Sequence, residues 1–282
     1  MAIITISHGP CSKGKEVAEE VAKRLHFPCI SREILMEASE EFNIPENKLL
    51  NAMHDSPTFL DRYHHGRERY LGYCRYELLK HAFEGDFVYH GVAGHYLLRA
   101  LPQVLKVRII ADMQARVEEY MVRNPVSESE AKEELLKNDE IRRQWSLRLY
   151  GTDTWDTRLY DMVLQVNRLQ ISDIVDMVCM AAEKPIFKRT KEAEVITTNL
   201  YLSAKIQSML MKLSFMIEVK VENSVATLSN VGEVLRGSEV LRAKIQESVE
   251  AVEGINQVVF ADENLEKSEY INTFYKLASK IK

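Results

Sequence analysis

The sequence predicts an α/β protein, in which a parallel sheet with helices on both faces precedes a small α+β domain. Two observations support this prediction. Up to about residue 185, short apolar segments rich in β-branched residues alternate with helical patterns, which is typical of a covered parallel sheet. Near Lys184-Pro185 the pattern changes to the order α-β-β-α-β. We therefore expect a first domain at residues 1–185, a second at 198–264 and a C-terminal amphipathic helix at 265–282.

The first region is expected to open with a strand at residues 2–7, because this β-branched run resembles a buried parallel strand. A helix at 15–25 follows, since apolar side chains recur there every four positions between charged ones. A Ser-x-x-Glu capping box at Ser127 predicts the start of a charged helix that runs to about Tyr150. The other expected elements are strands at 27–30, 86–90, 104–111 and 162–166, and helices at 32–42, 57–84 with a break near Gly66 or Gly72, 113–123 and 171–182.

The second region predicts a helix at 204–213 and two strands at 217–222 and 225–231, which alternate apolar and polar residues at period two. The pair Asn223-Ser224 between the strands is typical of a tight hairpin turn. A helix at 238–252 and a third strand after Gly254 complete the unit. The boundary between the two regions is expected near residues 186–200.

The composition is that of an ordinary globular protein. The chain has 282 residues, 46% of them apolar and 28% charged, and a net charge of −5, which argues against a dedicated nucleic-acid binder. No apolar stretch is long enough to span a membrane, and the N-terminus shows no export signal. The four cysteines are scattered and form no CxxC pair, so we expect reduced thiols in a cytoplasmic protein. No two histidines lie three or four positions apart, so we expect no metal site.

The segment Gly9-Pro-Cys-Ser-Lys-Gly14-Lys15-Glu16 fits the phosphate-binding pattern G-x-x-x-x-G-K between a strand and a helix. In this context backbone N–H groups and the helix N-terminus surround a phosphate, and Lys15 reaches the outer phosphates. The last position holds Glu16 where the pattern has Ser or Thr; this glutamate could contact a cation or only complement the helix dipole. The simpler alternative is a glycine turn followed by a solvated lysine.

Residues 1–183 resemble the cytidylate-kinase-like family, a branch of the P-loop nucleoside monophosphate kinases. That family commonly has Gly-Ser-Gly-Gly-Arg-Glu in the loop, so a glutamate at position 16 is normal for it. The resemblance implies a P-loop parallel sheet, ATP as phosphoryl donor, Mg²⁺ as cofactor and CMP or a related nucleotide as acceptor. Further matching segments are Val88-Tyr-His-Gly91-Val-Ala-Gly94, residues 104–111 with Arg116, Lys137-Asn-Asp139-Glu-Ile-Arg142, and Tyr160-Asp161-Met-Val.

The resemblance also implies roles for individual residues. Lys15 and Arg142 would be catalytic. The nucleotide-binding residues would be Gly9, Ser12, Lys13, Gly14, Lys15 and Glu16. The lid would contain Lys137, Asp139, Arg142 and Arg148, and the acceptor side Ser31, Arg32, Gly91 and Arg116. The pattern of the lid segment alone equally fits a solvated, charged helix face.

The chain departs from the family mainly on the acceptor side. Ser31 stands where the family has an aspartate, Val92 stands where it has an arginine, and the loop is bulkier at Pro10, Cys11, Ser12 and Lys13. Loss of an arginine that binds phosphate is not a conservative change. His90 and His95 flank the loop after the 86–90 strand and could supply a replacement contact. We therefore keep two alternatives to an active kinase, namely a non-catalytic nucleotide sensor with a degenerate kinase body and a scaffold that binds no nucleotide.

Residues 200–262 resemble the BON domain, a small α/β module. The matches are Val221-Glu-Asn-Ser-Val-Ala-Thr-Leu-Ser and Val252-Glu-Gly254-Ile255-x-x-Val258. BON domains are associated with membrane surfaces and with protein partners. This segment lacks a basic surplus, which favours a ligand-sensing or protein-docking role over lipid binding. A fold-stabilising appendage or a dimerisation element, and hence a homodimer, is the alternative.

Overall fold

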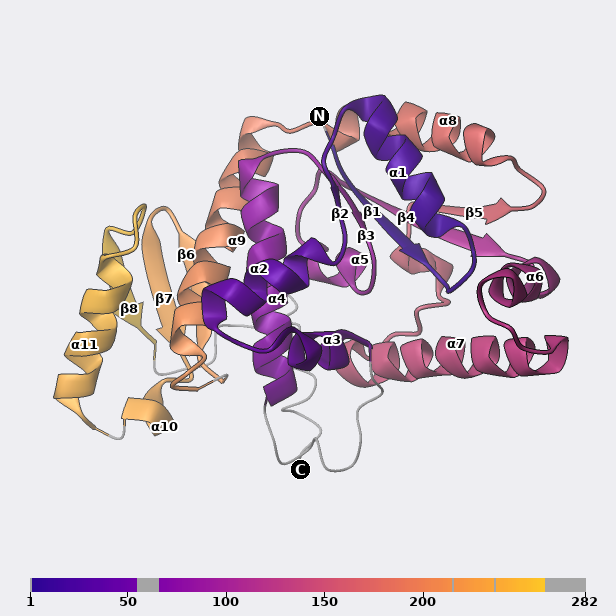
Figure 1. Cartoon of the computed structure of the whole chain (residues 1–282). Helices are drawn as coiled ribbons and strands as arrows, with labels where there is room; N and C mark the ends of the chain where they lie inside the picture. The colour runs from indigo at the N-terminus through magenta and orange to yellow at the C-terminus, as the bar shows by residue number, and fades with distance from the viewer. Residues whose placement is uncertain (1, 55–65, 215, 236, 262–282) are drawn as a thin grey trace.

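The computed structural model describes residues 2–54, 66–214, 216–235 and 237–261, which form two sheets that each have their own apolar core (Figure 1). The larger sheet is parallel throughout, with the strand order β2-β3-β1-β4-β5. Its strands are β1 (Ile3–His8), β2 (Cys29–Ile30), β3 (Val88–His90), β4 (Val104–Ala111) and β5 (Met162–Val166). The predicted α/β class with a parallel sheet is therefore confirmed.

Helices cover both faces of this sheet. On one face α1 (Gly14–Leu25) packs on β1 and β3, and α8 (Ile171–Ala182) packs on β4 and β5; Ile4, Val17 and Ile174 are fully buried there. The opposite face is covered by α2 (Glu33–Phe42), α3 (Glu46–His54), α4 (Gly66–Glu84), α5 (Gly94–Leu97), the end of α7 (Glu128–Tyr150) and α9 (Lys191–Leu210). The helix α6 (Met113–Arg123) packs on α7, and short 3₁₀ turns lie at Thr157–Leu159 and Pro185–Phe187.

The strand register decides where a site can form. All five strands are parallel, so their carboxyl ends meet at one edge of the sheet, where α/β proteins bind ligands. Ser7 of β1 lies beside Arg108 of β4, and Ile6 lies beside His90 of β3. Because successive strand residues point to opposite faces, Ser7 and His8 direct their side chains to different sides of the sheet.

The smaller sheet follows the predicted α-β-β-α-β order with one addition, a short extra helix between its second strand and the predicted second helix. The strands β6 (Glu218–Glu222) and β7 (Val225–Ser229) are antiparallel, and β8 (Gln257–Phe260) is parallel to β7. The helices are α10 (Gly232–Leu235) and α11 (Glu239–Glu250). Asn223 and Ser224 both have positive φ, 49° and 62°, as a two-residue type I′ turn requires.

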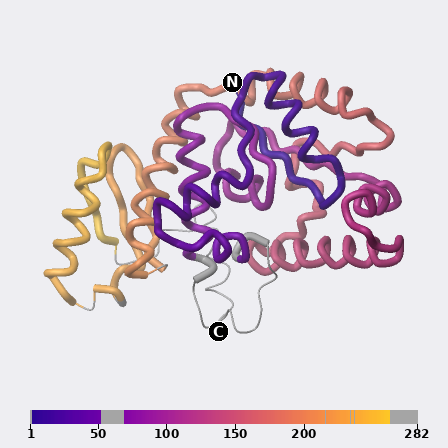
Figure 2. The backbone as a smooth tube through the Cα atoms, in the orientation of Figure 1, coloured from indigo at the N-terminus to yellow at the C-terminus, as the bar shows by residue number. Residues whose placement is uncertain are grey.

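A single helix, α9, joins the two parts of the chain, as Figure 2 shows. The sequence predicted a boundary within 186–200 and a helix only from Ala204, whereas α9 already begins at Lys191. Leu200 and Ala204 of α9 are buried in the core of the larger sheet, while Leu202, Ile206 and Leu210 are buried in the core of the smaller one. A helix that is apolar on two sides lacks the one-sided pattern by which amphipathic helices are recognised.

Of the two positions predicted for a break, Gly72 is wrong, because α4 continues through this residue, whereas Gly66 is the residue at which α4 begins. A Cβ atom at Gly72 would lie 2.0 Å from Cε of Met211, so the glycine allows the end of α9 to approach α4 closely. The helix α3 was not predicted, and the expected C-terminal helix at 265–282 lies outside the described residues. In the part of the chain that the structure describes, every helix is too short or too polar to cross a lipid bilayer.

Candidate active site

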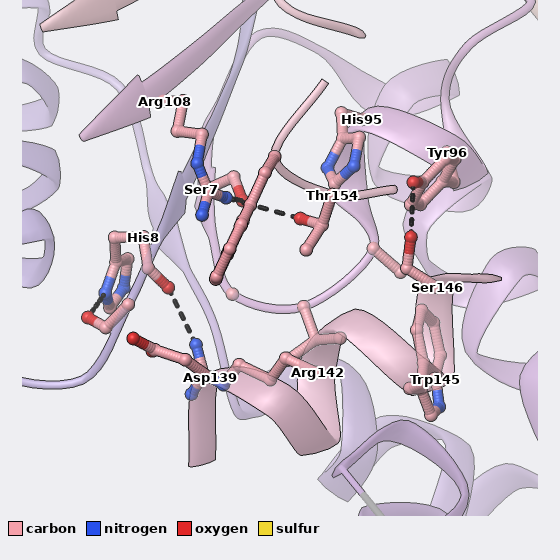
Figure 3. A pocket seen from close by; sticks show the side chains of 15 residues that line it. Ser7, His8, His95, Tyr96, Arg108, Asp139, Arg142, Trp145, Ser146 and Thr154 are labelled. Atoms are coloured by element: carbon pink, nitrogen blue, oxygen red, sulfur yellow. Dashed lines mark hydrogen bonds between the residues drawn. The ribbon is translucent and has the colours of Figure 1, made fainter. Parts of the chain in front are cut away.

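A pocket lies at the carboxyl edge of the larger sheet, between the end of β1, the loop after β3, the middle of β4 and the helix α7 (Figure 3). The segment that follows α7 closes its remaining side with Thr154 and Trp155. Each wall comes from a different part of the chain, so the pocket exists only because the parallel strands end together.

The predicted phosphate loop connects β1 to α1 as expected. The first helical hydrogen bond runs from Val17 N–H to the Lys13 carbonyl, so the amides of Gly14, Lys15 and Glu16 precede it and have no acceptor within the helix. The Ser12 hydroxyl donates to the Gly9 carbonyl over 2.8 Å and holds the loop closed. Free amides at a helix N-terminus form a site for an anion.

Two residues of this loop adopt a conformation that favours glycine. Cys11 and Lys13 have φ angles of 56° and 60°, in the left-handed region. Each such residue costs on the order of 1 kcal/mol or more of backbone strain. The loop therefore keeps its curved backbone path although Cys11 and Lys13, and not glycines, occupy the two left-handed positions.

His8 packs directly on Gly14. A Cβ atom at Gly14 would lie only 2.3 Å from Cβ of His8, which no side chain could accommodate. The His8 ring donates from Nδ1 to the Gly9 carbonyl over 3.0 Å, and burial lowers the pKa of His8 to about 4. The ring is therefore neutral at pH 7 and its Nε2 carries no proton, which leaves His8 a packing and acceptor group.

The charged side chains of the loop contact neighbouring helices. Lys15 is exposed and its Nζ lies 3.6 Å from Glu19, one turn along α1. Lys13 pairs with Glu119 of α6 over 2.9 Å, and Glu16 lies 3.4 Å from Arg123. None of Lys13, Lys15 and Glu16 lines the described pocket.

The helix α7 brings two predicted lid residues to the loop. Arg142 donates from Nη1 to the His8 carbonyl over 2.7 Å. Asp139 accepts both forked bonds of Arg116, over 2.7 and 2.9 Å, and Arg116 also donates to the Pro10 carbonyl. Arg116 is therefore placed behind the loop, clamped to the lid, and does not line the pocket. Lys137 and Arg148 are exposed on α7 and lie outside the pocket lining.

The predicted acceptor-side residues separate into two groups. Gly91 lines the pocket beside Val92. Ser31 and Arg32 lie at the start of α2, where the Ser31 amide donates to Glu33 and Arg32 pairs with Glu46 of α3. Neither of these two residues belongs to the pocket lining.

Sequence reasoning missed Arg108 of β4, whose guanidinium enters the pocket from the sheet. Its Nη1 lies 3.2 Å from the Ser7 hydroxyl, 3.3 Å from the Thr154 hydroxyl and 3.2 Å from the Tyr160 hydroxyl. The Tyr160 ring also lies 5.5 Å from the guanidinium carbon. One signal could have revealed it, because a basic residue inside a buried parallel strand breaks the apolar run that such strands show.

His95 lies next to this arginine and is almost completely buried. Its ring contacts the rings of Tyr96 and Tyr160 at tilted angles of 42° and 45°, and Nε2 lies 3.4 Å from the Tyr160 hydroxyl. Burial lowers the pKa of His95 to about 3, and the charges of Arg108 and Lys106 act in the same direction. The predicted loop histidine is thus a neutral member of the pocket wall.

The described residues contain no group of three or more His, Cys, Asp or Glu side chains that could hold a metal ion without other ligands. Mg²⁺ at a nucleotide usually needs only one or two carboxylates, with phosphates and water as the other ligands. Glu16 fits this requirement, because it lies in the first turn of α1 beside the loop amides and its contact to Arg123 is long.

Comparisons with known proteins find relatives of the larger domain. Residues 3–168 match the model of the cytidylate kinase-like family. The cytidylate kinase of Pyrobaculum aerophilum is 24% identical over 180 residues, which are 62% of this chain and 89% of the relative. That of Pyrobaculum neutrophilum is 24% identical over 188 residues, or 65% of this chain and 96% of the relative.

A solved structure shares the fold of the larger sheet. The crystal structure of an uncharacterized protein from Eubacterium ventriosum superposes with a TM-score of 0.51 at 20% identity. It covers 65% of this chain and 99% of that protein. At this identity the likeness concerns the fold alone.

Proposed function

The chain belongs to the cytidylate kinase-like family, and from this membership we propose that it is a P-loop phosphotransferase. It would transfer the γ-phosphoryl group of ATP to a nucleoside monophosphate of the CMP type. The catalytic residues would be Lys15 and Arg142. The donor phosphates would bind at Gly9 and Ser12 to Glu16.

One observation supports this proposal above the others. Arg142 of α7 donates to the carbonyl of His8, at the point where the strand β1 becomes the loop. A cation from a lid helix and the first residue of α1 therefore both lie against His8. Phosphoryl transfer needs such a combination, because catalysis depends on positioning and on neutralising the charge of the transferred group.

The loop side chains would complete the donor site. Lys15 is exposed and its contact to Glu19 is a surface pair, which costs little to break, so its ammonium can turn toward bound phosphates. Glu16 would hold the accompanying Mg²⁺, which when bound would screen the phosphate charges. We also propose that Asp139 acts through its bidentate pair with Arg116, which fixes α7 over the loop.

The smaller domain would regulate this site. The helix α9 contributes side chains to both cores, so a ligand or protein bound to the BON-like domain can act on the kinase body through a continuous element. A cytoplasmic location, a protein partner of this domain and a homodimer remain predictions from the sequence.

A second candidate is a nucleotide sensor without turnover. It is favoured by Ser31 and Val92, which leave two family contacts unmade, and by the backbone strain at Cys11 and Lys13. The two candidates share the donor site and differ only in whether an acceptor reacts.

The test is to incubate the purified chain with Mg·ATP and a panel of nucleoside monophosphates, and to measure both ATP binding and ADP release. We expect ATP to bind and CMP to give the fastest ADP release. Lys15→Ala should lower ATP affinity by at least about tenfold, because a charge-assisted contact to phosphate is lost. Lys23→Ala, an exposed lysine on the same helix paired with Glu20, is the matched control and should bind ATP normally.

The outcomes separate the candidates. Binding without ADP release would favour the sensor over the kinase. Unchanged ATP affinity in Lys15→Ala would show that the phosphate loop is wrongly assigned. A wild-type chain that binds no ATP would contradict both candidates.

A further inference from the structure

We propose that Arg108 of β4 binds the anionic phosphate of the acceptor nucleotide, in the place that the uncharged loop after β3 leaves without a cation. This inference rests on the proposed function, because it assigns the acceptor half of the same site.

Some of the hydrogen-bond donors of Arg108 are not used by the described residues. Its three hydrogen-bond contacts, to Ser7, Thr154 and Tyr160, all involve Nη1, which has only two protons to share among three hydroxyls. Its Nη2 and Nε donate to no residue that the structure describes. The hydroxyls therefore hold the guanidinium in position while most of its fork stays available for a ligand. A forked pair of donors matches the oxygens of a phosphate.

Arg108 also has no carboxylate partner of its own among the described residues: its charge acts on Asp153, but that carboxylate is bound by Arg143. Neither Arg108 nor Arg142 forms an ion pair within 4.0 Å with any carboxylate of the described residues. The carboxylate of Asp139 lines the same pocket but is already bound by Arg116. Burial lowers the pKa of Arg142; the charge of Asp139 opposes this, and the charges of Arg108 and Arg116 add to it. An anion bound between these two cations would relieve their repulsion.

Arg108 lies on the side of the sheet away from the loop amides, and this position indicates that the anion belongs to the acceptor. His8 lies against Gly14, the first residue of α1, on the side of the sheet where the loop amides would hold the donor phosphates. Ser7 and Arg108 lie on the opposite side of β1 and β4, toward Gly91, Val92 and His95. The loop after β3 offers Gly91, Val92 and Ala93 to the pocket and so contributes no positive charge from these positions. Arg142 touches the carbonyl between the two sides and can contact both ligands.

The pocket contains tryptophan side chains whose fluorescence can report ligand binding. The chain has two tryptophans, Trp145, which is 2% exposed, and Trp155, which is 55% exposed, and both line the pocket. Ligand entry should change the fluorescence of Trp155. A Trp155→Phe variant, in which this signal should disappear, identifies its source.

The experiment titrates the full chain with CMP, cytidine and inorganic phosphate, and measures ATP affinity separately by calorimetry. Arg108→Gln should weaken CMP binding by about 10- to 100-fold, since a charged hydrogen-bond partner is removed. It should leave the affinity for ATP and for cytidine, which has no phosphate, within about twofold of the wild type. Arg158→Gln removes the same charge from an exposed arginine and is expected to bind all ligands normally.

Each outcome decides the proposal. Unchanged CMP affinity in Arg108→Gln, an equal loss of ATP affinity, or a wild type that binds neither CMP nor phosphate would overturn it. A wild type that binds CMP through Arg108 without turnover would support it while contradicting the kinase as the proposed function. If Arg108→Gln does not fold, Arg108→Lys makes the same test, because lysine keeps the charge without the fork and should lose roughly tenfold in CMP affinity.

Discussion

At the scale of residues, the arginines near the pocket differ in whether a carboxylate balances their charge. Arg116 has a bidentate carboxylate and a loop carbonyl, so its charge is satisfied within the fold. Arg143 is paired with Asp153 over 2.7 Å and lies over the Trp155 ring. Arg108 and Arg142 have neutral oxygens as their hydrogen-bond partners. Buried charges of this kind are expensive, and proteins keep them mostly at functional sites.

The buried His95 predicts a loss of stability in acid. Its pKa in the folded chain is about 3, below the ordinary value of 6.5, so the unfolded chain takes up a proton first as the pH falls. The contribution of neutral His95 to the free energy of unfolding is therefore present above pH 6.5 and is lost as the pH falls toward 3. The loss for this group is roughly 2 kcal/mol at pH 5. His95→Gln cannot titrate and should lose correspondingly less between pH 7 and pH 5.

Urea unfolding of both proteins at pH 7 and pH 5 measures this difference. Between pH 7 and pH 8.5 the two proteins should change in parallel, which serves as the control. An identical acid loss in the variant would mean that other groups cause it.

At the scale of elements, the strand–loop–helix unit of β1 and α1 depends on close backbone approach. The helix α1 begins directly against the last residue of β1, where His8 fills the space that a side chain at Gly14 would need. The amides of the first turn are thereby held beside the end of the sheet. An anion site of this kind needs no charged side chain to exist, because the backbone supplies it.

Gly14→Ala should destabilise the protein although alanine is the better helix former. The new Cβ would lie 2.3 Å from Cβ of His8, and because that atom is next to the backbone, β1 or α1 must shift. We expect the free energy of unfolding to fall by about 1–3 kcal/mol, more than the gain of up to about 1 kcal/mol in helix propensity. ATP affinity should fall as well, because the loop amides move.

Gly85→Ala provides the matched comparison, since a Cβ there would have nothing within 4 Å. Its stability in urea should equal or exceed that of the wild type. Equal stabilities for the two variants would show that the contact between His8 and Gly14 is unimportant.

At the scale of the whole molecule, α9 couples two cores that would otherwise be independent. Tyr201 of this helix stacks on Phe83 of α4 and also packs against the core of the smaller sheet. The helix therefore cannot loosen on one side without exposing apolar surface on the other. The proposed regulation of the kinase body by the smaller domain would therefore need no contact to the pocket.

Ile206→Ala should reveal this coupling. Ile206 is fully buried in the smaller core, so the substitution should cost about 2–5 kcal/mol in stability. Amide hydrogen exchange should accelerate in β6 and β7 and also along α9, including the residues that face the larger sheet. Met209→Ala, at an exposed position of the same helix, should change the exchange little. Faster exchange confined to β6, β7 and β8 would mean that the two cores are independent.

Much of the fold could be predicted because its signals are local. The strands at 104–111 and 162–166, the capping box at Ser127 and the helix at 171–182 lie where their patterns indicated. Errors arose where a helix touches two partners, as α9 does, or where a glycine serves a close contact, as Gly72 does. In both cases the deciding neighbour is distant in sequence, so no local pattern reports it.

The sequence by itself determined the α/β class, the phosphate loop between β1 and α1, and the presence of Arg142 on a charged helix. These follow from periodicity, turn chemistry and spacing, which act over a few residues. Only the tertiary structure decided that Arg116 clamps Asp139 behind the loop and that Arg108, from a strand, faces Arg142 across the pocket. The physical reason is that charge balance depends on which side chains meet in space, and parallel strands bring together residues that lie far apart in the chain.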